Sequence, residues 1–248
     1  MTVLHEIALT TRRKLLESLR QPTWTISALA TPLMYLLLFA PLLRSALNTD
    51  NVMDAFVPGM LVLMAFSSGM GAGWNAVWEL ESGVTERLSA MPVSRCALLL
   101  GPVLRDVAVF ITTALIVALI AAPFGFAPVW PGFALAAAML AMLTACISSC
   151  SIALGLMLRD ISSLAAVVTG LQLPLTLLSG ILLPLENGPA WLRLLAHIDP
   201  LYYATSASRA LCGGSIASPE AITGMLITAA LAALAIAWSL HVQKTAVI

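Results

Sequence analysis

The chain has 248 residues, of which 60% are hydrophobic and only 10% are charged, whereas about a quarter of the residues in a soluble domain carry charge. Twelve Lys and Arg balance twelve Asp and Glu, so no basic excess indicates binding to nucleic acid. The composition excludes an ordinary soluble domain and predicts an integral membrane protein. Because a membrane-spanning helix uses about 20 residues, the length accommodates about six spans and no separate globular domain.

The first predicted element is an amphipathic helix within residues 1–21. From Val3 to Arg20, apolar side chains recur on one side of a helix and charged side chains on the other. Its basic residues suit anionic headgroups, so we expect it to lie at the membrane surface; a solvated leader is the alternative. The apolar run that follows is longer than a signal-peptide core, so we expect it to be retained as a span.

Uncharged apolar windows then predict six membrane-spanning helices and an all-α fold. We expect no ionisable side chain well inside any span, and this disfavours an ion-coupled carrier, because such carriers keep charged groups in the membrane. The predicted spans of this single transmembrane domain, residues 1–248, are residues 24–43, 56–78, 98–122, 133–158, 162–183 and 221–240.

An even number of spans places both termini on one side of the membrane. That side carries nine of the twelve Lys and Arg residues, and the opposite side carries Arg44, Arg193 and Arg209. Since cytoplasmic segments are enriched in Lys and Arg, the distribution predicts that both termini are cytoplasmic.

Two connections stand out by length and composition. The cytoplasmic segment 79–97 carries both signs of charge and is long enough for a short helix on which a partner could dock. The outer segment 184–219 is half apolar and contains aromatic residues that favour headgroup depth, so we expect an interfacial or re-entrant path. A proline cannot continue a helical hydrogen-bond ladder, so we expect two short helices there, broken near Asp199 and Pro200.

Polar and small residues within the spans suggest a path for an amphipathic substrate. Ordinary helix packing explains the same residue types, and both interpretations stay open. Gly69, Gly71 and Gly73 alternate in the second span, and we expect them to thin and loosen that helix rather than to form a close packing face. The residues predicted to line the path are Ser67, Ser68, Asn75, Gln172 and Thr176.

No motif for catalysis or for ATP hydrolysis occurs in the chain. Neither lysine, Lys14 or Lys244, follows a glycine, so there is no phosphate-binding loop. The four cysteines show no spacing typical of zinc ligands. The sequence therefore predicts a chain that is not an enzyme and holds no metal or cofactor.

Two stretches resemble the membrane subunits of type-2 ABC exporters. The first is Glu81-Ser-Gly-Val-Thr-Glu-Arg-Leu-Ser-Ala-Met-Pro-Val-Ser-Arg95. The second comprises Leu178-Ser-Gly-Ile-Leu-Leu-Pro-Leu-Glu186, then Pro189-Ala-Trp-Leu-Arg-Leu-Leu195, and finally Asp199-Pro-Leu-Tyr-Tyr-Ala204 with Arg209. The likeness extends over nearly the whole chain.

The resemblance implies that segment 79–97 contains a coupling helix, which docks on a nucleotide-binding ATPase subunit. Two such subunits, which bind ATP and Mg, would act with two copies of this chain or with this chain and a related permease. The residues assigned to coupling are Glu79, Glu81, Gly83, Glu86, Arg87, Leu88 and Pro92. Short outer helices would close the exit, although interfacial anchoring explains them equally well; the residues of this outer gate are Ser179, Gly180, Pro184, Pro200, Tyr202 and Tyr203.

The sequence and the resemblance together favour a permease that exports a hydrophobic or amphipathic small molecule, similar to a drug or an antibiotic, across the bacterial plasma membrane. Export of a polysaccharide or a lipid-linked glycan is the alternative within transport. A membrane immunity or assembly protein that transports nothing is the alternative from another class.

Overall fold

The structure is a computed structural model that describes residues 3–20, 30, 32–35, 37, 38, 52–84, 94–181 and 190–246. All regular structure in these residues is helical, so the all-α class is confirmed for the described part of the chain. The helices are α1 (Val3–Arg20), α3 (Val52–Glu81), α5 (Arg95–Ala121), the 3-10 turn η1 (Ala122–Phe124), α6 (Trp130–Leu158), α7 (Ile161–Leu178), α8 (Ala190–Ala196), α9 (Pro200–Cys212) and α10 (Pro219–Ala246).

Five of the described helices are long and apolar enough to cross a membrane: Phe56–Glu81, Cys96–Phe124, Trp130–Leu158, Ile161–Leu178 and Pro219–Gln243. They correspond to the second to sixth predicted spans, so the chain is a multi-pass membrane protein. Most of the first predicted span, 24–43, lies outside the described residues. The residues of this span that the structure describes are 30, 32–35, 37 and 38, and they are helical. The count of six spans therefore stays a prediction.

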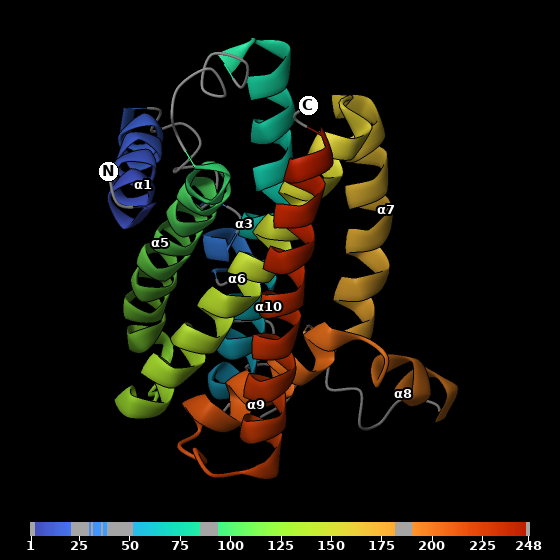
Figure 1. Ribbon diagram of the computed structural model, residues 1–248. Coiled ribbons are helices and arrows are strands. Elements are labelled where there is room, and N and C mark those ends of the chain that lie inside the picture. The colour runs from blue at the N-terminus through green and yellow to red at the C-terminus, as the bar shows by residue number, and fades with distance from the viewer. Residues whose placement is uncertain are drawn as a thin grey trace.

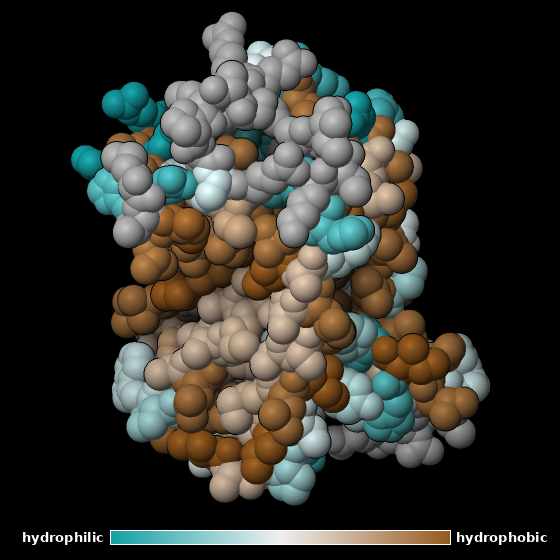
Figure 2. Space-filling model, viewed as in Figure 1, coloured by the Kyte–Doolittle hydropathy of each residue, from teal (hydrophilic) through white to brown (hydrophobic). Residues whose placement is uncertain are grey.

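The helices stand roughly side by side as a bundle, and the short helices α8 and α9 lie at one end (Figure 1). We call this the α9 end. The opposite end, which we call the α1 end, carries α1, the start of α5 and the C-terminal part of α10. On the face shown in Figure 2, hydrophobic side chains cover the middle of the bundle below the more polar α1 end, and the α9 end mixes hydrophobic and polar residues; a hydrophobic middle is expected for a surface that faces lipid.

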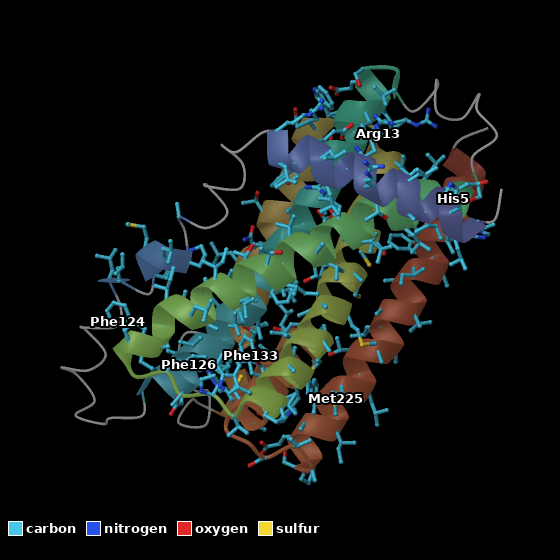
Figure 3. The ribbon with its side chains drawn as sticks, turned by 90° about the vertical axis from the view of Figure 1, so that its left-hand side faces the viewer. His5, Arg13, Phe124, Phe126, Phe133 and Met225 are labelled. Carbon is cyan, nitrogen blue, oxygen red and sulfur yellow. The ribbon has the colours of Figure 1, made fainter. Side chains whose placement is uncertain are left out.

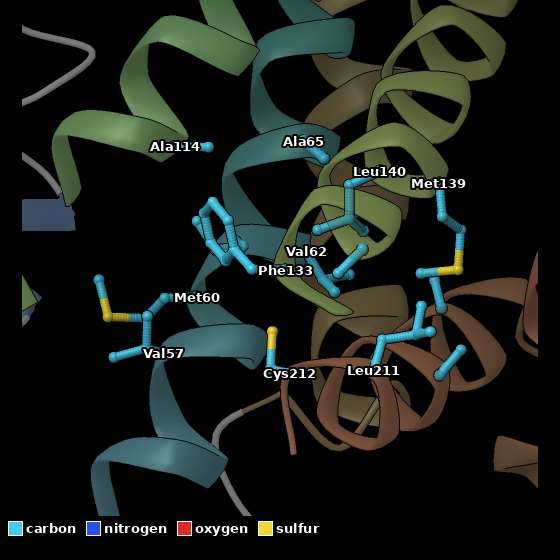
Figure 4. Close-up of a cluster of buried hydrophobic side chains, with 14 of the residues drawn as sticks. Val57, Met60, Val62, Ala65, Ala114, Phe133, Met139, Leu140, Leu211 and Cys212 are labelled. Carbon is cyan, nitrogen blue, oxygen red and sulfur yellow. The ribbon is translucent and has the colours of Figure 1, made fainter. Parts of the chain in front are cut away.

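The core of the bundle is formed mainly by α3 and α6. Their apolar windows are 67% and 56% buried, whereas that of α7 is only 11% buried. Val57, Val62, Phe133 and Leu140 belong to the main cluster, and Leu211 of α9 joins it (Figure 4). The α9 end of the bundle is therefore packed as a continuous core, while most of α7 is left uncovered by the described chain.

The expectation that the alternating glycines loosen α3 is wrong for two of them. Gly69 and Gly73 lie four residues apart, on one face of the helix. A Cβ at Gly69 would lie 2.7 Å from Ile147 Cβ, and a Cβ at Gly73 would lie 2.5 Å from the Ser151 carbonyl oxygen. These glycines therefore allow α3 and α6 to approach closely, as small residues do in membrane helix pairs. Of the three alternating glycines, only Gly71 faces open space.

The expectation that no span contains a buried ionisable group is also wrong. Asp106 of α5 is 3% exposed, and its Oδ2 accepts a hydrogen bond from Ser148 Oγ of α6 at 2.7 Å. Arg105 Nε lies 3.2 Å from Asp106 Oδ1. The average hydropathy of a long apolar window hides one such pair, so the composition of the spans gives no argument against ion coupling.

Candidate functional site: the α1 end and the outer helices

Helix α1 lies directly against the first turns of α5. Thr10 Oγ1 donates hydrogen bonds within α1 and approaches the Ala97 carbonyl oxygen of α5 at 3.2 Å. A Cβ added to Gly101 would lie 2.8 Å from Thr10 Cβ, so only glycine allows this approach. Figure 3 shows α1, with His5 and Arg13, at the opposite end of α5 from Phe124 and Phe126. The sequence predicts the helix but not this docking.

Two charged contacts attach α1 to both ends of the connection between α3 and α5. Lys14 forms an ion pair with Glu79 in the last turn of α3, and both side chains are less than one-fifth exposed. Glu6 Oε2 accepts a hydrogen bond from the backbone N–H of Ser94, the N-cap of α5, at 2.8 Å. Helix α1 therefore contacts the chain on both sides of the connection formed by residues 82–94: at the end of α3 before it and at Ser94, its last residue.

The contact at Ser94 is electrostatically favourable for two reasons. A helix N-terminus has unpaired N–H groups and a partial positive charge, and a carboxylate that accepts from the N-cap N–H performs the part that glutamate plays in a capping box. Hydrogen bonds from the Ser94 backbone and side chain lower the pKa of Glu6 below its usual value. Glu6 of α1 thus caps a different helix, α5.

The predicted coupling residues fall into three groups. Glu79 and Glu81 belong to α3 rather than to the connection, and Glu79 is paired with Lys14 within the chain while Glu81 is exposed. Gly83 has φ +70° and follows the end of α3, the left-handed position at which glycine commonly ends a helix. The remaining predicted residues, Glu86, Arg87, Leu88 and Pro92, lie outside the described residues.

The predicted path residues lie on α3 and α7, which pack together through Val77, Leu164 and Val168. Ser67 and Asn75 are exposed and eight residues apart on α3, so they share a face. Asn75 Nδ2 donates to the Gly71 carbonyl oxygen at 3.2 Å.

The other three members of the path set are less exposed. Ser68, Gln172 and Thr176 are of intermediate exposure. Thr176 Oγ1 is buried and has no hydrogen-bond partner among the described residues. No described contact joins the members of the path set into one site.

The outer segment contains two short helices, α8 and α9, separated at residues 197–199 as the sequence predicts. Asp199 Oδ1 caps α9 by accepting from Leu201 N–H at 2.9 Å, and Pro200 occupies the first turn, where its missing N–H has no cost. Tyr202 and Tyr203 stack edge-to-face with ring centroids 5.6 Å apart, and Tyr203 Oη donates to the His197 carbonyl oxygen.

The first part of the predicted outer gate is buried beside α9. Helix α7 ends at Leu178, five residues before the end of the predicted span, because Ser179 and Gly180 form a turn in which Gly180 has φ +67°. Ser179 Oγ donates to the Thr176 carbonyl oxygen at 2.7 Å. The structure therefore brings Ser179 and Gly180 to the same end as α9; Pro184 lies outside the described residues.

Sequence reasoning assigned no role to several residues that make these contacts. The periodicity of residues 3–20 predicts a charged helix face that includes Glu6, and Lys14 belongs to its basic cluster, but the pattern does not indicate which residues these two side chains contact. Arg209 closes the second motif, and its guanidinium reaches the turn after α7. Among the described residues, no three His, Cys, Asp or Glu side chains come together as a metal site.

The long apolar helices, the amphipathic helix that contacts both ends of the α3–α5 connection and the two short outer helices define a multi-pass helical membrane protein. A family model described as ABC-2 type transporter matches residues 5–212, so the match covers every described helix except α10. The chain belongs to the ABC-2 type transporter family and is an ABC transporter permease.

Named relatives agree with this assignment. Two relatives are ycf38 proteins, whose name describes a transport permease. The ycf38 protein of Cyanophora paradoxa is 28% identical to this chain, over 84% of this chain and 74% of that protein. The ycf38 protein of Porphyra purpurea is 26% identical to this chain, with the same coverage of both. The daunorubicin resistance ABC transporter permease protein DrrB1 of Streptomyces coeruleorubidus is 24% identical, over 78% of this chain and 70% of that protein.

Proposed function

We propose that this chain is the membrane subunit of an ATP-driven exporter that moves a hydrophobic or amphipathic small molecule out across the bacterial plasma membrane. A separate ATPase, present in two copies and carrying ATP and Mg, supplies the energy. Two copies of this chain, or this chain and a related permease, form the path. The chain itself hydrolyses nothing.

One observation carries the proposal: α1 holds both ends of residues 82–94, through Lys14–Glu79 and Glu6–Ser94. A connection whose ends are fixed to the bundle can transmit a displacement to α3 and α5 instead of absorbing it. Nucleotide-driven closure of two ATPase subunits that grip this connection would tilt the helices as rigid bodies.

The chain path supports six spans with cytoplasmic termini. Lys14 of α1 meets the end of α3 at Glu79, whereas Asp54 in the first turn of α3 accepts from Ala127 N–H, beyond the far end of α5. Helix α1 and the start of α3 therefore lie at opposite ends of a helix that is 30 residues long, and this supports the proposal that a further span lies between Arg20 and Val52. The excess of Lys and Arg at the α1 end favours a cytoplasmic location for that end.

The name of the Streptomyces relative, a daunorubicin resistance permease, supports a small-molecule cargo for this chain. The uncharged face of α3 that carries Ser67 and Asn75 is compatible with an amphipathic substrate. Export of a lipid-linked glycan remains the second candidate, because polar side chains on α3 and α7 could also accompany a sugar.

The test is co-expression with the ATPase partner. We expect Glu86→Ala and Gly83→Val to reduce complex formation and stimulated ATP hydrolysis, whereas Glu220→Ala, an exposed glutamate in the first turn of α10 at the α9 end, serves as the matched control and changes neither. Normal assembly and turnover in both connection variants would contradict the coupling role.

Cargo is tested in inside-out vesicles that contain the complex. ATP-dependent accumulation of daunorubicin would support small-molecule export, and movement of a lipid-linked glycan instead would favour the second candidate. If neither moves and no ATPase associates, the chain is a non-transporting membrane factor and the proposed function is wrong.

A further inference from the structure

Helix α9 is fixed to the packed part of the bundle. Its buried residues Leu201, Ala204, Ala207 and Leu211 belong to the main core cluster. Glycines bring its backbone against two neighbours: any Cβ at Gly132 of α6 would collide with the Leu211 carbonyl oxygen, and any Cβ at Gly224 of α10 would collide with Ala207. Since protein cores are close-packed, α9 cannot shift without moving α6 and α10.

Helix α7 is attached much less extensively. Only 11% of its apolar window is buried, but the turn that follows it is not exposed: Ser179 and Ile181 are each 1% exposed. The Ile181 carbonyl oxygen lies against α3, because a Cβ on Gly59 would come within 2.7 Å of it. The outer end of α7 is thus held where α3 and α9 meet.

Arg209 of α9 provides the polar contact of this junction. Its Nη2 donates to the Gly180 carbonyl oxygen at 2.9 Å and to the Ile181 carbonyl oxygen at 3.3 Å. Carbonyl groups at and beyond a helix C-terminus lack helical partners, and a cation there also interacts favourably with the helix dipole. A hydrogen bond from a charged donor is stronger than one between neutral groups.

We propose that Arg209 is a positioning residue that holds the turn after α7 on α9 and thereby keeps the predicted outer gate closed. The inference rests on the proposed function and adds to it the contact that sets the position of Ser179 and Gly180. Because α9 is fixed to α6 and α10, release of this contact leaves the turn after α7 with the packing of Ile181 against α3 but without the hydrogen bonds to α9, and this loosens the outer end of α7. An exit held in this way leaks when the guanidinium is removed, even though ATP hydrolysis at the α1 end continues.

The test compares four variants of the full chain in complex with its ATPase. Arg209→Met removes all side-chain donors, Arg209→Gln keeps a neutral NH2 group that can donate, and Arg209→Lys keeps the positive charge. The matched control is Thr205→Val on the same helix, because Thr205 is buried and its hydroxyl bonds only to Leu201 of α9 in the described contacts. The control therefore alters the buried interior of α9 without touching the junction.

The first measurement needs no transport. Amide hydrogen exchange of residues 176–181 is expected to be at least about tenfold faster in Arg209→Met, the effect of losing the hydrogen bonds from the guanidinium to the Gly180 and Ile181 carbonyl oxygens. Arg209→Lys and Arg209→Gln are expected to lie between Arg209→Met and the wild type. Thr205→Val is expected to leave this segment unchanged. Equal exchange in wild type and Arg209→Met would overturn the inference, whatever the cargo.

The second measurement is daunorubicin moved per ATP hydrolysed in inside-out vesicles, together with leakage of preloaded daunorubicin without ATP. Arg209→Met is expected to keep stimulated ATP hydrolysis, to move several-fold less cargo per ATP, and to leak faster, with partial rescue by Arg209→Lys. A purely structural role would lower assembly, ATP hydrolysis and transport in proportion, and this outcome would overturn the inference. If the wild type moves no cargo while the exchange result holds, the proposed function fails and the junction stands.

Discussion

A single serine hydroxyl joins the two central helices through backbone groups. Ser151 Oγ of α6 accepts from Gly73 N–H at 3.0 Å and donates to the Met70 carbonyl oxygen at 2.6 Å. Both partners belong to the backbone of α3, and a side chain inserted at such groups is a recognised cause of local bending in a helix. The contact is possible because glycine at position 73 leaves room for the serine.

This contact predicts opposite outcomes for two neighbouring glycines. Gly73→Ala would place a Cβ 2.5 Å from backbone and side-chain atoms of Ser151, so we expect it to destabilise the protein by about 1 to 3 kcal/mol. Gly71→Ala meets no atom within 4 Å and should be neutral or slightly stabilising, since alanine favours helices by about 0.5 to 1 kcal/mol over glycine. Thermal unfolding in detergent checks both, and equal melting temperatures would contradict the close packing of α3 on α6.

Two aspartates cap helices at opposite ends of the bundle and respond to pH in opposite directions. Burial raises the pKa of Asp199 to about 6, although the Leu201 N–H favours the ionised form. Hydrogen bonds from the Ser163 side chain and backbone lower the pKa of the exposed Asp160, the N-cap of α7. A pKa that differs between the folded and unfolded states makes stability depend on pH.

The sign for each aspartate follows from proton binding. Folded Asp199 binds its proton more tightly than the unfolded residue, so its contribution is present near pH 4 and is lost as the pH rises through about 6. Asn also caps helices but does not titrate, so the stability of wild type relative to Asp199→Asn should fall from about pH 4 to about pH 7, by about 1.4 kcal/mol per unit of pKa difference. Asp160→Asn is the control, because wild type should gain relative to it as the pH rises to about 5 and should then stay level, since the lowered pKa of Asp160 lies below that range. Parallel slopes for the two variants in thermal unfolding would contradict the burial of Asp199.

At the scale of elements, the sequence predicts the long helices well because a membrane span is a local property of about 20 apolar residues. The helix over Val3–Arg20 and the break before Pro200 are local as well. The end of α7 at Leu178 is missed, because apolar residues continue beyond the turn at Gly180 and hydropathy does not register a positive φ.

Contacts between elements were not predictable in the same way. Lys14 and Glu79 are 65 residues apart, and Glu6 and Ser94 are 88 apart; helical periodicity indicates which face of α1 is charged but not which acid or amide it meets. The Asp106–Ser148 contact was not predicted for a different reason: two polar residues barely lower the average hydropathy of a long apolar window. The free-energy cost of burying Asp106 in the membrane is reduced because the Ser148 hydroxyl and the Arg105 guanidinium lie beside its carboxylate.

At the scale of the whole molecule, the two ends of the bundle are fastened by different means. The α1 end is held by charged side chains between α1, α3 and α5, whereas the α9 end is held by close-packed backbones and by Arg209 on the turn after α7. Charged contacts at the α1 end surround the connection on which an ATPase partner is proposed to act. A change in those contacts should therefore alter coupling while the apolar core stays intact.

The Lys14–Glu79 pair tests this arrangement by charge reversal. Lys14→Glu and Glu79→Lys should each place like charges together and cost about 2 kcal/mol, because both side chains are largely buried; each should also reduce ATP hydrolysis stimulated by the partner. The double variant restores an opposite pair and should recover most of both properties. A small cost should remain, because Lys14 Nζ also lies 3.3 Å from Glu17 Oε2 and a glutamate at position 14 would repel Glu17. The control is Arg13→Glu alone, which reverses an exposed charge 3.0 Å from Glu17 and leaves Lys14 and Glu79 unchanged; it should cost less than about 1 kcal/mol. If the Lys14–Glu79 double variant stays as defective as the single variants, the attachment of α1 to α3 is not what positions the connection for its partner.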